Sequence, residues 1–219
     1  MAAEAIAEDR GMDNTVNILA IGAHPDDIEY GCGGTLLKYA QAGHGVYLYV
    51  ATHGSVGGAG DERAVEMESS AERLGADELF WGGYTDTQIP LSQDLISEIE
   101  GIISKVNPKF IFTHWRDDTH QDHRNLTACT LSATRYIPNF LFYEGPTSQG
   151  FTPNVYVDIT EVLEKKTELL RIHASQMTKT HIEETTIIDM AMSNATFRGI
   201  QARVRHAEGF NSQRLLINI

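Results

Sequence analysis

Short apolar runs rich in β-branched residues alternate along this chain with longer segments in which apolar residues recur at helical spacing. The run 16–23 (VNILAIGA) predicts a buried strand, and in the segment 33–44 the residues Leu36, Leu37 and Ala40 mark one face of a helix. Strands that alternate with helices of about 10–15 residues indicate βαβ units and a parallel sheet. The same reasoning predicts strands at 45–52, 78–83, 109–115, 139–144 and 154–160, helices at about 62–74 and 92–106, and a mostly helical tail from about 160 to 208.

The chain of 219 residues has the length of one domain. It contains no internal repeat, low-complexity block or linker. Residues 1–14 show no usable periodicity, and we expect them to be a disordered extension. The sequence therefore predicts a single α/β domain over residues 15–219.

Composition narrows the class of partner. Asp and Glu number 30 against 17 Lys and Arg, which gives a formal net charge of −13. Because an acidic surface repels phosphate backbones and there is no local basic patch, we expect no nucleic-acid partner. No stretch approaches the roughly 18 apolar residues that cross a bilayer. The N-terminus also lacks the pattern of a signal peptide, so we expect a cytoplasmic protein with no membrane partner.

The first cluster of chemically active residues, AHPDD at 23–27, directly follows the first predicted strand. In open α/β sheets ligands bind at the carboxyl ends of the strands, which places His24, Asp26 and Asp27 where a site is expected. One of the two aspartates can hold a metal while the other stays free beside it. The alternative is that the Asp pair only caps the following helix.

The second cluster, HWRDDTHQDH at 114–123, directly follows the strand predicted at 109–115. His120, Asp122 and His123 lie within four residues, and both clusters follow strands of one predicted sheet. Two histidines and one carboxylate drawn from the two loops leave a position open for water, as in catalytic zinc sites. The same donor set suits ferrous iron in oxygenases, so the residues alone do not name the metal.

Together the two motifs AHPDDIEYGCGGTL and DTHQDHRNL resemble the PIG-L/LmbE family of zinc-dependent N-deacetylases. The resemblance extends from about residue 16 to residue 210. It implies a Rossmann-like three-layer α/β sandwich with the active site at the carboxyl ends of a mostly parallel sheet. It also implies removal of the acetyl group from a small N-acetylglucosamine-type sugar or conjugate. Bacterial relatives often form homo-oligomers, hexamers among them, and the resemblance suggests the same here.

The resemblance also assigns roles to individual residues. It implies that Asp26 is the general base, that protonated His120 stabilises the transition state, that Asp122 is the charged partner of His120, and that Arg63 contacts substrate. Asp118 matches a frequent acidic position without a clear role. The family's metal ligands would correspond to His24, Asp27 and His123, holding one zinc ion.

Three functions remain open on the sequence. The first is a zinc-dependent N-deacetylase. The second is another metal-dependent hydrolase or an iron oxygenase on the same ligands. The third is a non-catalytic sugar-binding protein, which would require loss of a catalytic group, yet Asp26, His120 and all three ligands are present. For Arg63 the alternative is a solvated arginine at the start of a helix.

Overall fold

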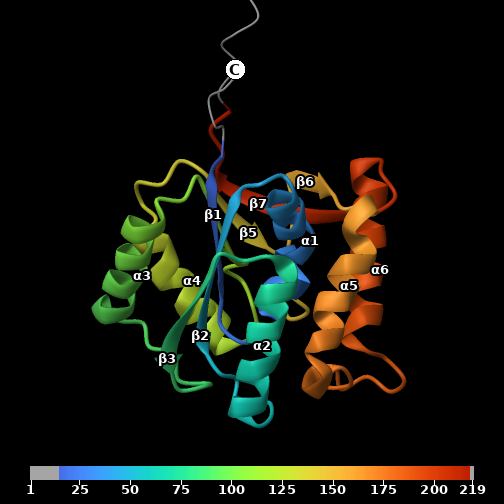
Figure 1. Cartoon of the computed structure of the whole chain (residues 1–219), viewed down its shortest axis with the longest axis horizontal. Helices are drawn as coiled ribbons and strands as arrows, with labels where there is room; N and C mark the ends of the chain where they lie inside the picture. Colours follow the sequence, from blue (N-terminus) through green and yellow to red (C-terminus); the bar gives the residue numbers. More distant parts are fainter. Residues whose placement is uncertain (1–14, 218–219) are drawn as a thin grey trace, which may run out of the picture.

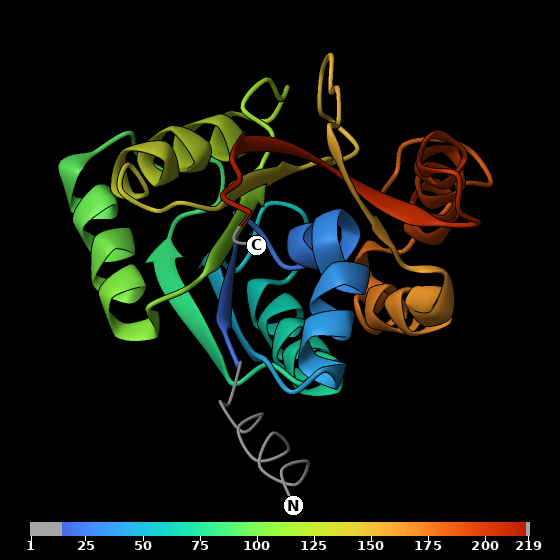
Figure 2. The same ribbon diagram turned by 90° about the horizontal axis from the view of Figure 1, so that it is seen from above.

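A computed structural model describes residues 15–217 of the chain. The extension predicted at residues 1–14 lies outside these residues. Figures 1 and 2 show a central sheet with helices on both faces. The structure therefore confirms the predicted three-layer α/β fold.

The sheet has seven strands in the order β3-β2-β1-β4-β5-β7-β6. Strands β1 to β5 are parallel, while β7 runs antiparallel to both of its neighbours. The strand order reverses between β1 and β4, and this is the topological switch point at which open α/β sheets bind ligands. The strands are β1 (Asn17–Gly22), β2 (Gly45–Thr52), β3 (Glu78–Tyr84), β4 (Phe110–His114), β5 (Phe140–Tyr143), β6 (Val155–Asp158) and β7 (Ala207–Arg214).

Alternating side chains of the parallel strands form the two halves of the core. In β1, Ile18 and Ala20 face one cluster of buried residues, and Leu19 and Ile21 face the other. Helices α1, α2 and α5 cover the first face, α3 and α4 cover the second, and α6 packs on α5 and β7 (Figure 1). The helices are α1 (Asp27–Gln41), α2 (Gly60–Leu74), α3 (Gln93–Val106), α4 (Gln121–Ala133), α5 (Leu163–Ile172) and α6 (Ile187–Ala202).

Helix α1 approaches the sheet closely because it contains glycines. A Cβ atom on Gly31 would lie 2.1 Å from the ring of Tyr143, and one on Gly34 would lie 2.8 Å from Ile159. These glycines weaken the helix in isolation, and the contacts they permit hold it in place. The start of α1, with Asp27 as its first residue, is thereby fixed against the ends of the strands.

One predicted boundary was wrong and two elements were not predicted. The helix predicted from residue 33 begins at Asp27, and α4 was not predicted at all. The tail is mostly helical up to Ala202, as predicted, but the strand β7, which begins at Ala207 and inserts between β5 and β6, was not predicted. Within residues 15–217, no helix combines the length and the apolar character needed to cross a bilayer.

Candidate active site

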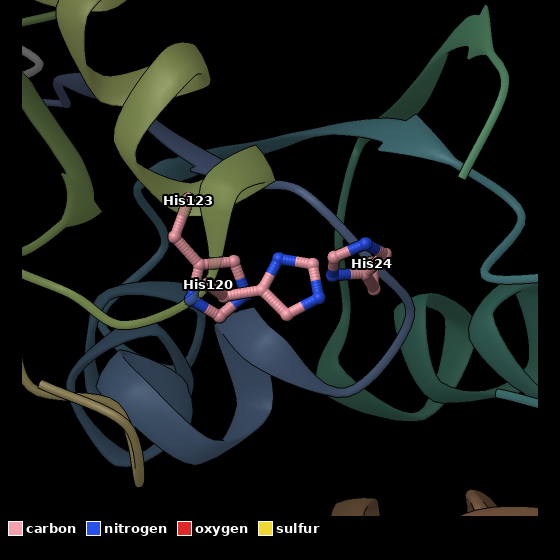
Figure 3. A group of neighbouring side chains, drawn as sticks. All are labelled: His24, His120 and His123. Carbon is pink, nitrogen blue, oxygen red and sulfur yellow. The ribbon is translucent and has the colours of Figure 1, made fainter. Parts of the chain in front are cut away.

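The two predicted clusters meet at the switch point of the sheet. His24 and Asp26 lie in the turn after β1, and Asp27 begins α1. His120 is the N-cap of α4, and His123 lies in its first turn. Figure 3 shows the rings of His24, His120 and His123 gathered in one place. Their centroids are separated by 4.7 to 5.5 Å.

His24 and His123 each lie close to the carboxylate of Asp27. Asp27 Oδ2 lies 3.3 Å from His24 Nδ1, and Asp27 Oδ1 lies 3.4 Å from His123 Nε2. Both histidines are buried. Among the described residues, three groups have ligand atoms within 4.8 Å of one another: His24, His120 and His123; Asp27, His114 and His123; and His24, Asp86 and Asp122. Each residue of the ligand set that the resemblance implied therefore belongs to at least one such group, and the set itself stays a prediction.

The other nitrogen of His24 has carboxylate partners. Its Nε2 lies 3.2 Å from Asp122 Oδ2 and 3.0 Å from Asp86 Oδ1. Asp122 also accepts backbone N–H bonds from Thr87 and Ile89, which hold its carboxylate in place beside His24. A His24 Nε2–H donating to these carboxylates leaves Nδ1 free for a metal.

The Asp122 carboxylate contacts His24, and only the Asp122 backbone N–H contacts the His120 ring, donating to Nδ1 at 3.2 Å. The charge of Asp122 nevertheless acts to raise the pKa of His120, so its assignment as the charged partner of that ring stays a prediction. The contact with His24 was not expected from the sequence. Asp122 therefore orients a candidate metal ligand.

His114 lies beside the ligands but is poorly placed to be one. Its ring stacks on His123 with centroids 3.9 Å apart, and its Nε2 lies 3.3 Å from Asp27 Oδ2. That same Nε2 accepts the backbone N–H of Ala23 at 3.0 Å. The lone pair that a metal would need is already used. Burial, followed by the charge on His123, lowers the pKa of His114 to about 4 and keeps the ring neutral.

His120 presents one nitrogen to the pocket. Because Nδ1 accepts the Asp122 N–H, the neutral ring carries its proton on Nε2. Burial and the neighbouring His123 and His24 rings lower the pKa of His120. The arrangement fits a neutral imidazole that donates from Nε2; the protonated His120 that the resemblance implied stays a prediction.

Asp26 and Arg63 form the opposite side of the turn. Arg63 is buried, and its guanidinium donates to the carbonyls of Gly54 and Pro25 at 2.8 and 2.7 Å. It lies 3.5 Å from Asp26 Oδ1. Arg63 is therefore not the solvated helix-start arginine that the sequence left open. It fixes the turn that carries Asp26.

The two adjacent aspartates differ in their affinity for a proton. Burial, followed by the charge on Asp27, raises the pKa of Asp26 to about 6, and Arg63 opposes the rise. Burial also acts to raise the pKa of Asp27, but His123 and His114 outweigh it and hold that pKa well below its usual value. Two neighbouring carboxyl groups whose pKa values differ in this way are suited to different chemical roles.

These residues line a pocket of about 520 Å³. Sequence reasoning assigned no role to Asp86 or His114 and left that of Asp118 open. Asp86 follows β3, and its position after a parallel strand was the one signal available. The lining side chains are His24, Asp26, Asp27, Tyr30, Val56, Gly57, Arg63, Asp86, Thr87, His120, His123, Pro146, Thr147, Gln176, Lys179, His181 and Ile187.

The doubly wound sheet and the His–Asp–His cluster at its switch point define an α/β protein with a candidate catalytic metal site. The model of the PIG-L family, described as GlcNAc-PI de-N-acetylase, matches residues 19–134, more than half of the chain. The chain belongs to this family.

Individual relatives are deacetylases by name. The chain is 38% identical over 152 residues to the uncharacterized deacetylase YaiS of Escherichia coli, covering 66% of this chain and 82% of that protein. It is 31% identical over 185 residues to the diacetylchitobiose deacetylase of Thermococcus kodakarensis, covering 73% and 69%. The solved N,N'-diacetylchitobiose deacetylase of Pyrococcus horikoshii superposes with a TM-score of 0.80 at 26% identity, covering 91% of this chain and 84% of that one.

Proposed function

We propose that this protein is a zinc-dependent N-deacetylase that hydrolyses the acetamide of an N-acetylglucosamine-type sugar to acetate and the free amine. The observation that carries the proposal is the placement of Asp26. It shares the pocket with His24, Asp27 and His123; among the described residues it belongs to none of the groups that could hold a metal, whereas each of those three belongs to at least one. A free carboxylate next to a three-ligand site is what amide hydrolysis requires.

The donor set suits zinc. Nitrogen and carboxylate ligands suit Zn²⁺, and a carboxylate second shell orients His24. When bound, zinc lowers the pKa of a water molecule to about 7 and polarises the acetyl carbonyl. Ferrous iron uses the same donor types, so the metal is decided by reconstitution rather than by geometry.

Two side chains supply the rest of the chemistry. Asp26 takes the proton of the attacking water and returns it to the departing amine, acting as base and then as acid. His120 Nε2–H donates a hydrogen bond to the oxygen of the tetrahedral intermediate, an interaction typically worth about 10²–10³ in rate. Arg63 holds the turn and lines the pocket, where its guanidinium offers donors to sugar hydroxyls.

Two classes of N-acetylated sugar are represented among the relatives. Besides the diacetylchitobiose deacetylases, a probable N-acetyl-α-D-glucosaminyl L-malate deacetylase of Bacillus cereus is 26% identical over 211 residues. Both substrates carry an acetamide on a glucosamine ring. A pocket of about 520 Å³ has room for such a sugar. We therefore assign the substrate class by the N-acetylglucosamine unit.

The test is acetate release from N,N'-diacetylchitobiose and related N-acetylglucosamine conjugates by the purified chain. We expect turnover with zinc, loss of turnover after chelation and recovery when zinc is restored. Full activity in a metal-free preparation would overturn the zinc dependence. Recovery with ferrous iron alone, or a requirement for oxygen, would favour the oxygenase. Zinc binding without acetate release from any conjugate would favour the sugar-binding protein.

A contrast between the adjacent aspartates tests the assigned roles. Asp26→Asn keeps all three ligands, so it should bind zinc normally while its rate falls by roughly 10²–10⁴. Asp27→Ala removes one ligand and should lose zinc. Metal content and rate are measured on the same preparations. Zinc loss in Asp26→Asn together with zinc retention in Asp27→Ala would show that the roles are reversed.

A further inference from the structure

Asp118 is a buried carboxylate that no step above uses. It lies in the loop between β4 and α4, and its side chain is 1% exposed. Its Oδ2 lies 3.3 Å from Nδ1 of His123, the ring nitrogen that does not face Asp27. Within the described part of the chain, His123 Nδ1 has no well-aligned hydrogen-bond partner, which leaves Asp118 as its neighbour of opposite charge.

The second oxygen of Asp118 joins two other parts of the site. Oδ1 accepts the backbone N–H of His120 at 2.8 Å and the hydroxyl of Thr147 at 2.6 Å. Backbone bonds reinforce this link, because the N–H of Thr119 donates to the Thr147 carbonyl and the N–H of Gln149 donates to the Asp117 carbonyl. Thr147 lines the pocket. One carboxylate therefore touches a metal ligand, the His120 backbone and the pocket loop.

We propose that Asp118 is a positioning residue with two separate functions. Through Oδ2 it holds the proton of His123 on Nδ1, so that Nε2 keeps its lone pair for the metal. Through Oδ1 it holds Thr147 and the following loop against the pocket. A carboxylate behind a ligating histidine typically contributes about 10–100-fold in metal affinity. This inference rests on the metal site of the proposed function.

Substitutions separate the two functions. Asp118→Asn can keep an acceptor at Oδ1 for His120 and Thr147, but it places an NH₂ group opposite His123 Nδ1. That group donates to Nδ1, which favours the tautomer with its proton on Nε2, where zinc would bind. Thr147→Val removes the loop's hydrogen bond to Oδ1 and leaves the longer contact of the Ser148 hydroxyl with Oδ2, at 3.4 Å. Asp117→Asn removes the same charge at the adjacent, exposed position and is the matched control.

The experiment is zinc affinity measured by competition with a chromophoric chelator, with circular dichroism to confirm folding. We expect the Kd for zinc to rise about 10–100-fold in Asp118→Asn. It should stay within about twofold of the wild type in Thr147→Val and Asp117→Asn. Thr147→Val should instead raise KM. A Kd for Asp118→Asn within twofold of the wild type, or an equal rise in Asp117→Asn, overturns the proposal.

A measurement on the wild type tests the proposed tautomer of His123 even if Asp118→Asn does not fold. In zinc-loaded protein labelled with ¹⁵N-histidine, NMR should show His123 with its proton on Nδ1 and the metal on Nε2. The opposite assignment overturns the proposal while leaving the deacetylase intact. A wild type that binds no zinc removes the metal site itself and with it the zinc-dependent mechanism.

Discussion

At the scale of single residues, both the backbone conformation of Asp26 and its buried negative charge disfavour folding. Its φ of 95° lies in the left-handed region, which costs a non-glycine residue of order 1–3 kcal/mol, somewhat less for Asp. Its carboxylate is held beside that of Asp27. Both features weaken the fold, and they place a free carboxylate beside the proposed metal ligands. Asp26 is therefore a residue at which stability and activity are opposed.

Neutralising Asp26 should stabilise the metal-free protein. The folded pKa of about 6 lies above the unfolded value of 3.8, so the ionised carboxylate disfavours the fold. This free-energy penalty on folding is absent below about pH 4, grows between about pH 4 and pH 6, and is complete above pH 6. Asp26→Asn, which tolerates the same backbone, should raise the free energy of unfolding at pH 8 by about 1–2 kcal/mol.

Urea denaturation with chelator present, at pH 4 and pH 8, checks this expectation. The increase in the free energy of unfolding of Asp26→Asn over the wild type should disappear at pH 4, where the wild-type carboxyl is protonated. A variant less stable than the wild type at pH 8 would show that the carboxylate supports the turn, most directly through its contact with Arg63.

At the scale of elements, α1 is held by a buried ion pair inserted beside its backbone. The N–H groups of Gly34 and Thr35 donate to the Glu208 carboxylate at 2.8 and 2.7 Å. The Lys166 ammonium donates to Glu208 and to the carbonyl of Tyr30, both at 2.6 Å. A strand, β7, and a helix, α5, thereby share in fixing the helix that begins with Asp27.

Removing the lysine ammonium from this ion pair should destabilise the folded protein. Lys166→Met leaves the Glu208 carboxylate buried without a counter-charge and should lower the free energy of unfolding by about 3–5 kcal/mol. Arg73→Met breaks the exposed pair with Glu168 and should cost less than about 1 kcal/mol. Urea denaturation of both variants gives the comparison. Similar small losses would mean that helix packing alone holds α1.

At the scale of the whole molecule, the site exists only because the sheet brings three loops together. His24 and Asp27 follow β1, Asp86 follows β3, and His120 and His123 follow β4. The proposed metal ion would take its ligands from the loops after β1 and β4 and would stabilise the folded chain relative to the unfolded one. Folding and metal binding would then be thermodynamically linked.

Metal removal should lower the melting temperature. At a free zinc concentration 100 times Kd, binding stabilises the folded state by about 2.7 kcal/mol. Scanning calorimetry should show a lower Tm after chelation and its return when zinc is added. Asp27→Ala is the control and should show a much smaller change under the same conditions. An unchanged Tm in the wild type at saturating zinc would contradict the linkage.

Local patterns along the chain were enough to predict most of the elements and both clusters. Buried parallel strands are near-continuous apolar runs, so β1, β2 and β4 were visible, and the helices predicted at about 62–74 and 92–106 are α2 and α3. The fixed order of strand and loop placed both clusters at one edge of the sheet. That is why one shared site could be expected before any distance was known, and the family resemblance then implied which of its residues are the ligands.

Only the tertiary structure decided how the side chains pair. Strand β7 was missed because Glu208 interrupts its apolar pattern, and its burial depends on Lys166, 42 residues away. Helix α4 was missed because its threonines have low helix propensity, and one of them, Thr130, bonds back to the Leu126 carbonyl. The partners of Asp122 and Asp118 depend on which way a side chain turns in a packed site. Such directions are set by contacts between distant segments, which local spacing along the chain does not encode.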